Sequence, residues 1–533
     1  MFRIWRKNSL YCFIYLSSML LLGSNSKMTN KKITLIELDS KTPNLGKMIA
    51  MPRLGITAIG SILSRENDVK VLADCYRHVS LDEVLATNPD IIMFNGMQTS
   101  LNRIRELAGK IKAILPNVPI VVGGEQATQN PASVKDFSDF IVLNEGDESV
   151  RSLVDSWDNP ERLSSIPGIM FKQDGQWQTT EKADRVRNID FRLNPGIIRG
   201  MGETASGLMA KILNITPGLR YLSFPIQTSR GCYKKCSFCT TEALFGSREF
   251  HTRSIDDVLS DIDAVIGQGI SHVNIVDNLF GGNKRYAIEL LKRMKERYSG
   301  KITAGVLMRA DQFDSAKTGS FSSEELALMK QAGISTISIG VESINPETLK
   351  RIAKEETIAQ YENAIRAIKK AGIDVTATFG VGGGEDTVRD MQEIISFARK
   401  NKINCVNLYA FTIAPGTEEA RQNSHLIIPG VSDDLVNGHA VTTLPRKMLP
   451  SQLQEGILDA MGSFYSWTNP TGIFHKIHLR RIRDSLSGHL ANLKSMEKEM
   501  IEKGIYSQVE GNWQLNEEAL KANPIRYSRV SRR

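Results

Sequence analysis

Short apolar runs alternate with longer amphipathic stretches from residue 28 to about residue 159. The apolar runs have the length of strands and occupy residues 33–38, 69–73, 91–95, 120–122 and 140–143. Between them, residues 55–65 and 101–115 are among the stretches that read as helices. Strands that alternate with helices predict a parallel, doubly wound sheet, so residues 28–159 are expected to form a Rossmann-like α/β domain.

The same alternation returns in residues 221–420 and predicts a second α/β domain. Its strand-like runs occupy residues 222–227, 272–277, 302–307, 336–340, 374–380 and 404–411. Several helix ends between them are recognisable: Ser254 and Ser322 each precede an acidic residue by three positions, and Gly333 and Gly372 stand where helices end. Six strand–helix units are too few for a closed barrel of eight.

Two segments follow other patterns. Residues 160–220 are expected to connect the two domains and to contain a hairpin, because Asp174-Gly175 lies between apolar flanks. Residues 421–533 are expected to form a helical C-terminal region, with helices at 451–465, 474–485 and 489–502.

Composition and charge exclude one class of function. The 533 residues are 41% hydrophobic and 24% charged, which is ordinary for a globular protein of several domains. The formal net charge of +8 would suit a nucleic-acid-binding protein, but two acid-free ends account for all of it. Four basic residues lie in residues 1–28 and four in residues 524–533, so the body of the chain is neutral. We therefore expect no nucleic-acid partner.

The N-terminal segment allows three interpretations. Basic residues up to Lys7 precede an apolar run at residues 10–23, which is short for a membrane span but resembles a secretory signal. Met28 stands directly before the first predicted strand and could be the natural start. We favour residues 1–27 as a misassigned start over a leader, with a membrane anchor as the third possibility. The expected location is cytoplasmic, without stable membrane insertion.

Three of the six cysteines lie in one loop, Thr228-Ser-Arg-Gly-Cys-Tyr-Lys-Lys-Cys-Ser-Phe-Cys-Thr240. Cys232, Cys236 and Cys239 have the spacing C-x3-C-x2-C, directly after an apolar run. Thiolates suit zinc, copper(I) or iron–sulfur clusters. A structural zinc site needs a fourth ligand, and His251 is the only imidazole nearby. A four-iron cluster held by three cysteines would leave one iron open, and we favour it over zinc and over free thiols.

This spacing resembles the signature of the radical S-adenosylmethionine (SAM) enzymes, in which SAM binds the open iron. Aromatic residues such as Tyr233 and Phe238 commonly flank the cysteines of that family. The resemblance implies a 4Fe–4S cluster, SAM as cofactor and a partial (β/α)6 barrel. It also implies that strand ends contact SAM, and the matching residues here are Glu342, Ser343, Arg309, Asp277 and Gly382.

The first domain resembles the cobalamin-binding domain that precedes the radical SAM domain in one large subfamily. The similar segments are Pro52-Arg-Leu-Gly55, Gly123-Gly-Glu-Gln-Ala-Thr128 and Asn144-Glu-Gly-Asp-Glu148. Ligands of doubly wound sheets lie at the carboxyl ends of the strands, and glycines there let a large flat ligand approach the backbone. The resemblance implies cobalamin contacts from Ser100, Gly123, Gly124, Glu145 and Gly146.

One cobalamin motif is missing. The D-x-H-x-x-G sequence that supplies a histidine to cobalt would fall near Asp39, where the chain reads Asp-Ser-Lys-Thr-Pro. His78 follows the second strand and is interpreted as a surface histidine. We therefore expect cobalamin to bind without a histidine from the protein. A degenerate domain that has lost cobalamin is the alternative.

Together, these resemblances imply a cobalamin-dependent radical SAM enzyme that cleaves SAM to a 5′-deoxyadenosyl radical. C-methylation of a small-molecule substrate is the favoured activity, with a low-potential donor such as flavodoxin or ferredoxin supplying electrons. An oxidative cyclase or ring-rearranging enzyme is the alternative within the subfamily. A noncatalytic cobalamin or iron–sulfur carrier is the alternative of another class.

Overall fold

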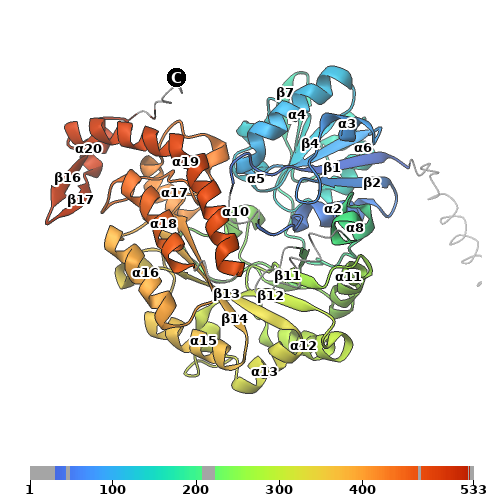
Figure 1. The fold of residues 1–533 in the computed structure, drawn as a ribbon. Coiled ribbons are helices and arrows are strands. Elements are labelled where there is room, and N and C mark those ends of the chain that lie inside the picture. Colours follow the sequence, from blue (N-terminus) through green and yellow to red (C-terminus); the bar gives the residue numbers. More distant parts are fainter. Residues whose placement is uncertain (1–29, 44–47, 207–221, 466–469, 526, 528–533) are drawn as a thin grey trace, which may run out of the picture.

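The computed structural model describes residues 30–43, 48–206, 222–465, 470–525 and 527, and it shows two α/β domains followed by a helical region (Figure 1). The predictions made for residues 1–27 lie outside this part of the chain. Among the described residues, no helix combines the length and the apolar composition that crossing a membrane requires.

The first domain is built on a seven-stranded sheet in the order β2-β1-β3-β4-β5-β6-β7. Its parallel strands are β1 (Lys32–Glu37), β2 (Asp68–Ala73), β3 (Ile91–Asn95), β4 (Ile120–Gly123) and β5 (Phe140–Val142). The helices of this domain include α2 (Leu54–Leu63), α3 (Leu81–Leu85), α4 (Leu101–Ile114), α5 (Glu125–Gln129) and α6 (Ser149–Ser156). The central strands are buried on both faces, as continuous apolar runs require. This confirms the predicted fold class.

The predicted hairpin is present, but it belongs to this sheet. Strands β6 (Ile169–Gln173) and β7 (Gln176–Thr179) pair antiparallel, and β6 pairs with β5. Asp174 (φ 51°) and Gly175 (φ 78°) form the turn with two positive φ angles that a two-residue hairpin favours. The hairpin joins the sheet edge because Ile169 and Phe171 are buried there.

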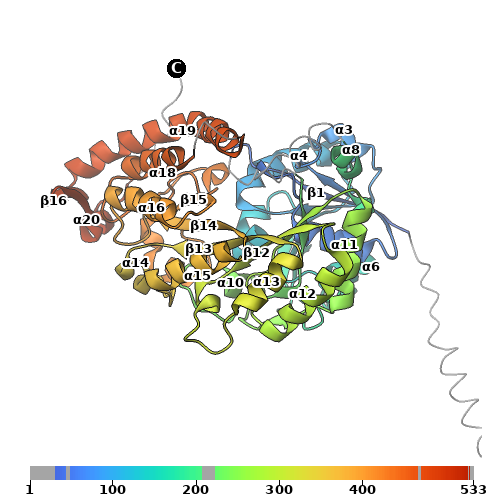
Figure 2. The same ribbon diagram turned by 60° about the horizontal axis from the view of Figure 1, so that its bottom comes forward.

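The second domain is a six-stranded parallel sheet in the order β15-β14-β13-β12-β11-β8. The strands are β8 (Phe224–Ile226), β11 (His272–Ile275), β12 (Thr303–Met308), β13 (Ile334–Glu342), β14 (Asp374–Val381) and β15 (Cys405–Ala410). Figure 2 shows the connecting helices along one face of this sheet; they are α11 (Ile255–Gly267), α12 (Lys284–Tyr298), α13 (Ser323–Gln331), α15 (Ile358–Lys370) and α16 (Val388–Lys400). The cap residues behave as predicted: the side chains of Ser254 and Ser322 accept helix N–H groups, and Gly333 and Gly372 have positive φ.

The C-terminal region corrects one prediction. It contains α18 (Pro450–Phe464), α19 (Pro470–Glu502), the hairpin β16 (Tyr506–Val509) and β17 (Asn512–Leu515), and α20 (Glu517–Ala522). The two helices expected at 474–485 and 489–502 are one continuous helix. A glycine inside a helix costs only about 1 kcal/mol, and the burial of Leu486 and Leu493 on either side of Gly488 offsets that cost.

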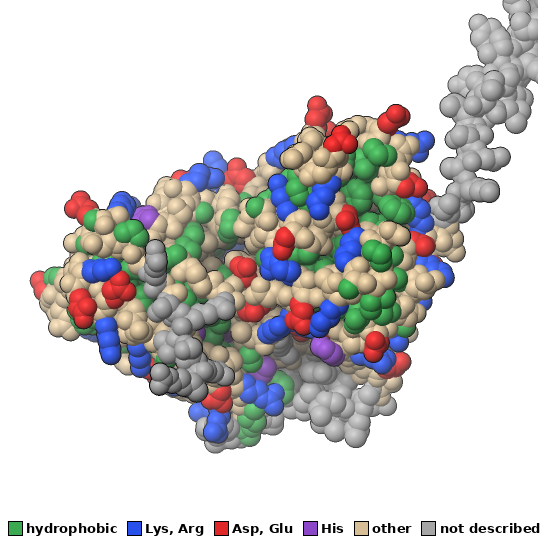
Figure 3. Space-filling model, turned by 90° about the horizontal axis from the view of Figure 1, so that it is seen from above, with side chains coloured by type: hydrophobic (Ala, Val, Ile, Leu, Met, Phe, Trp, Pro, Cys, Tyr) green, Lys and Arg blue, Asp and Glu red, His purple; other side chains and the backbone are tan. Residues whose placement is uncertain are grey.

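Charged side chains of both signs lie on one face of the molecule. Figure 3 shows lysine and arginine side chains interspersed with aspartate and glutamate over the upper face of the molecule. No broad field of one sign covers this face.

Candidate active site

The cysteine loop begins at the carboxyl edge of the second sheet, after β8, and the end of β11 holds it in place. The Asp277 carboxylate accepts hydrogen bonds from the Thr228 backbone N–H (2.7 Å) and from the hydroxyls of Thr228 (2.5 Å) and Ser229 (2.6 Å). Asn278 accepts from the Gly231 N–H (3.1 Å). Asp277 was predicted to contact SAM. Here it is 2% exposed and both oxygens bind the loop, so the structure gives it a positioning role and its SAM contact stays a prediction.

The loop requires glycine at position 231. Gly231 has φ of 101°, and a Cβ atom there would lie 1.9 Å from the Glu249 carbonyl oxygen. Any other residue would therefore have to move the backbone that carries Cys232.

The three cysteines of the loop form no disulfide. Cys232 and Cys236 are buried and Cys239 is half-buried. In the part of the chain that the structure describes, no three His, Cys, Asp or Glu side chains are placed to hold a single metal ion. A closed zinc site needs such convergence. In a four-iron cluster, by contrast, each cysteine thiolate binds a different iron.

Two buried cations lie beside Cys236. The Arg309 Nη1 atom lies 3.6 Å from the Cys236 Sγ atom and can donate to it. Burial raises the pKa of the Cys236 thiol, while the positive charges of Lys354 and Arg309 oppose that rise. Both cations therefore favour a thiolate at this position.

Arg309 and Lys354 belong to one buried charge network. Arg309 donates to the Lys354 carbonyl (2.5 Å) and to Asp311 (3.2 Å), and it lies 3.5 Å from Glu356. The Lys354 ammonium lies 3.3 Å from Glu342 and 3.5 Å from Glu356. Two predicted SAM contacts are thus linked through Lys354: Arg309, which lies next to Cys236, and Glu342.

The remaining predicted SAM residues meet at Asp386. Ser343 is 2% exposed and donates to one Asp386 oxygen (3.3 Å), while the Gly382 N–H donates to the other (3.1 Å). Asp386 therefore ties the end of β13 to the loop after β14. Glu342 has φ of 64°, and the register between β13 and β14 shifts there. A residue held in this conformation points to a functional constraint.

Sequence reasoning missed Lys354, Glu356 and Asp386. Lys354 and Glu356 lie in a polar stretch without a strand-end motif, where Ala353 and Glu355 have positive φ values of 51° and 57°. Asp386 ends the segment Gly382-Gly-Gly-Glu-Asp386 after β14, in which only Gly382 was predicted to contact SAM. A charged residue in such a stretch reads as exposed, yet these three are buried.

A cavity of about 290 Å³ lies at the carboxyl edge of the first sheet. Four of the five residues predicted to contact cobalamin line it: Gly123, Gly124, Glu145 and Gly146. Ser100 does not, because it is buried and its hydroxyl donates to the Met97 carbonyl (3.1 Å). Gly124 has φ of 98°, and a Cβ atom there would lie 2.4 Å from Asn95 Oδ1. A largely apolar cavity with glycine in its wall fits part of a large flat ligand such as cobalamin.

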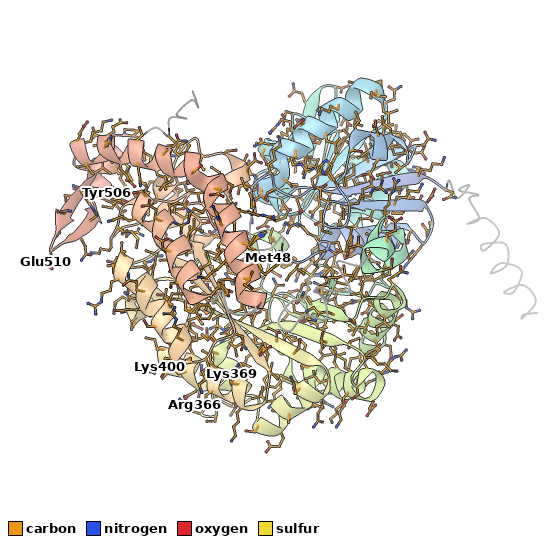
Figure 4. All side chains as sticks on the ribbon, viewed as in Figure 1. Met48, Arg366, Lys369, Lys400, Tyr506 and Glu510 are labelled. Atoms are coloured by element: carbon orange, nitrogen blue, oxygen red, sulfur yellow. The ribbon has the colours of Figure 1, made fainter. Side chains whose placement is uncertain are left out.

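The second domain completes the wall of this cavity with Gln227, Arg230 and Phe245. Arg230 lies two positions before Cys232, so the cysteine loop and the cobalamin cavity are neighbours. In the view of Figure 4, Met48 lies between the two domains.

Arg230 is held by the first domain. Its guanidinium donates to Glu145 (2.7 Å) and to both oxygens of Asp147 (3.1 and 3.2 Å), and also to Gln227 (3.2 and 3.1 Å). Glu145 also lies 2.6 Å from Arg185 and accepts from the Val186 N–H (3.0 Å). Arg230 and Glu145 are both buried. This cluster fixes the cysteine loop against the predicted cobalamin segment.

Glu37, at the carboxyl end of β1, has a shifted pKa that makes the stability of the fold depend on pH. Burial raises its pKa from 4.5 to about 7, although Arg53 opposes the shift. The folded state then keeps a proton between pH 4.5 and 7 that the unfolded state loses. We predict that this group lowers stability by about 3 kcal/mol as the pH rises through this window, with no further loss above pH 7.

Urea unfolding of Glu37→Gln between pH 4.5 and 7.5 checks this prediction. The slope of the free energy of unfolding against pH should become less negative than in the wild type. Glu66→Gln is the control, because Glu66 forms only an exposed ion pair with Arg151 at 3.5 Å. Equal slopes in both variants would contradict the assignment to Glu37.

Comparison with known families identifies both α/β domains. Residues 50–154 match the model of the B12 binding domain, and residues 226–398 match that of the Radical SAM superfamily. The chain belongs to the cobalamin-binding radical SAM enzymes. The family resemblance seen in the sequence is thereby confirmed. The expected cofactors, a 4Fe–4S cluster, SAM and cobalamin, are confirmed with it.

This radical SAM enzyme has similar proteins among curated sequences and solved structures. It is 25% identical over 377 residues to the uncharacterized methyltransferase PH0819 of Pyrococcus horikoshii, covering 69% of this chain and 77% of the relative. It is 24% identical to the hopanoid C-2 methylase of Rhodopseudomonas palustris and 25% identical to the anaerobic magnesium-protoporphyrin IX monomethyl ester cyclase of Cereibacter sphaeroides. These two alignments cover 69% and 74% of this chain, and 63% of each relative, less than two thirds of its length.

Among solved structures, OxsB with aqua-cobalamin and SAM bound matches with a TM-score of 0.65 and 16% identity, over 93% of this chain and 74% of OxsB. TsrM of Kitasatospora setae with cobalamin and a [4Fe-4S] cluster matches with a TM-score of 0.60 and 15% identity, over 86% of this chain and all of TsrM. These likenesses support the shared fold.

Proposed function

We propose that this enzyme is a C-methyltransferase that methylates an unactivated carbon of a small-molecule substrate. When bound, the cofactors would supply the hard chemistry, a radical from SAM and a methyl group carried on cobalamin. The protein residues hold, orient and shield them. The observation that carries the proposal is the shared wall: Arg230 lies in the cobalamin cavity and two residues from Cys232.

Each predicted contact has a role in this proposal. Cys232, Cys236 and Cys239 bind the cluster. Glu342 and Ser343 hold SAM, Lys354 fixes the Glu342 carboxylate, and Arg309 fixes Lys354 through its backbone carbonyl. Gly382 forms the neighbouring backbone. Gly123, Gly124 and Gly146 allow cobalamin to approach the backbone, and Glu145 fixes the loop beside it. Ser100 is buried directly before α4, and we propose that it supports the start of this helix beside the cobalamin site without touching cobalamin.

The names of similar proteins support methylation as the activity and oxidative cyclisation as the alternative. PH0819 is named as a methyltransferase and the Rhodopseudomonas protein as a methylase acting at carbon 2 of a hopanoid. The cyclase of Cereibacter sphaeroides supports the oxidative cyclase as second candidate. A carrier that only stores cofactor has no use for Glu342 and Ser343 beside the cysteines.

We also propose that the first domain extends past residue 159 through the β6–β7 hairpin. The electron is proposed to come from flavodoxin or ferredoxin.

Label from SAM separates the two enzymatic candidates without knowledge of the substrate. The reconstituted enzyme is reduced anaerobically with SAM that carries a deuterated methyl group. We expect the label to appear on the bound cobalamin, together with S-adenosylhomocysteine. The formation of 5′-deoxyadenosine with no label on cobalamin would reject methyl transfer and favour the cyclase.

A further inference from the structure

A surface beside the cysteine loop has a composition that the proposed function leaves unexplained. Tyr233, directly after Cys232, is 50% exposed and packs edge-on against Phe250, with ring centroids 6.3 Å apart. The Lys234 ammonium lies 5.9 Å from the centre of the Tyr233 ring. Lys235 is exposed and takes part in no ion pair within the described residues. Exposed aromatic rings with cations beside them are typical of protein interfaces.

A polar hollow of about 290 Å³ opens next to Tyr233, between the loops that follow β11 and β12. Lys234, Lys284 and Lys317 line it, against one carboxylate, Asp311. Lys234 neutralises Asp311 at 2.7 Å, and Lys284 is paired with Glu325 at 2.8 Å. Lys317, whose side chain is 45% exposed and lies 3.9 Å from Asp311, adds excess positive charge to this hollow. This face therefore offers positive charge around an exposed ring.

The position of this surface indicates what it binds. Reductive cleavage of SAM needs one electron from outside the protein, and electron transfer between proteins falls steeply with distance. Tyr233, Lys234 and Lys235 lie in sequence between Cys232 and Cys236, so a partner seated on them would lie close to the cluster that these cysteines are proposed to bind. Complementary charge steers such partners and fixes their orientation.

We propose that Tyr233, Lys235, Lys317 and the hollow between them form the docking surface of a small acidic protein that donates single electrons, of the flavodoxin or ferredoxin class. In each encounter the donor is oxidised by one electron and the cluster is reduced by one, with no other group transferred. The inference rests on the proposed function only in requiring a reducible cluster. It adds the surface on which the reductant binds.

The chain offers a matched control on the opposite side of the barrel. Arg366 and Lys400 lie near the ends of α15 and α16, just before β14 and β15 begin, and Figure 4 shows them on the lower outside of the domain. Both are exposed. They therefore lie at the amino edge of the sheet, whereas the cysteine loop lies at the carboxyl edge.

The test is a binding titration of the cluster-loaded enzyme with a recombinant bacterial flavodoxin. Lys235→Glu/Lys317→Glu is compared with Arg366→Glu/Lys400→Glu, since each pair changes the charge by the same amount. At low ionic strength we expect the Kd to rise roughly tenfold or more in the first variant and to stay within about twofold in the control. Added salt should weaken wild-type binding. An unchanged Kd in the first variant, or an equal loss in the control, would overturn the docking surface.

A second readout separates this inference from the proposed function. The formation of 5′-deoxyadenosine is measured with the flavodoxin system and with dithionite. The first variant should be slow only with flavodoxin, and equal slowing with dithionite would overturn a docking role for the two lysines. If the wild type forms no product with dithionite, the proposed function fails, while the titration still decides where flavodoxin binds.

Discussion

Replacing Cys236 with alanine is expected to abolish both the iron–sulfur chromophore and the formation of 5′-deoxyadenosine from SAM. Only three thiolates are available in the loop, and Cys236 is the one beside Arg309 and Lys354. With two cysteines left, two of the four irons would have no protein ligand, so the cluster should not assemble. The visible absorption spectrum, iron content and product yield after anaerobic reconstitution measure the effect.

Cys75→Ala is the matched control, because Cys75 lies outside the loop and follows β2 in the first domain. It should retain iron and SAM cleavage at close to wild-type levels. If Cys236→Ala had the same iron content and visible absorption as Cys75→Ala, the loop would not hold the cluster.

Replacing Arg230 with alanine is expected to destabilise the fold by about 3–5 kcal/mol and to weaken cobalamin binding at least tenfold. The substitution removes a buried cation and leaves the carboxylates of Glu145 and Asp147 facing the cavity. Glu145 keeps Arg185 as a partner at 2.6 Å, but Asp147 loses its bidentate contact. Urea unfolding and a spectroscopic titration with hydroxocobalamin measure the two effects.

Two further substitutions sharpen this prediction. Arg230→Lys keeps the charge but cannot form the forked contact, so it should fall between the wild type and alanine. Arg192→Ala removes an exposed partner of Asp257 (3.0 Å) and should cost less than about 1 kcal/mol. If Arg230→Ala lost no more stability than Arg192→Ala and bound cobalamin normally, the proposal that Arg230 joins the two domains beside the cobalamin cavity would be wrong.

The sheets could be predicted from the sequence because their strands are buried on both faces. Such strands appear as continuous apolar runs, and β3 (Ile91–Asn95) begins and ends at the predicted residues. Parallel strands also place their carboxyl ends on one edge. This rule is consistent with Gly123, Gly124, Glu145 and Gly146 meeting at one cavity from two separate motifs.

The rest of the site depends on contacts that a single sequence does not encode locally. Arg230 and Glu145 are 85 positions apart, and nothing in either segment indicates that they pair. Lys354 and Asp386 are charged residues in polar stretches, and only the packed fold shows that they are buried. The continuity of α19 was missed for a related reason, because burial of its flanking leucines outweighs the local preference of Gly488.

The electron paramagnetic resonance of the reduced enzyme with SAM labelled by ¹³C at its carboxylate tests the vacant iron site directly. Three cysteine ligands leave one iron without a protein ligand, so the account predicts hyperfine coupling between the cluster and the labelled carbon. A cluster signal without that coupling, or a protein that purifies with one zinc ion and no sulfide, would contradict it.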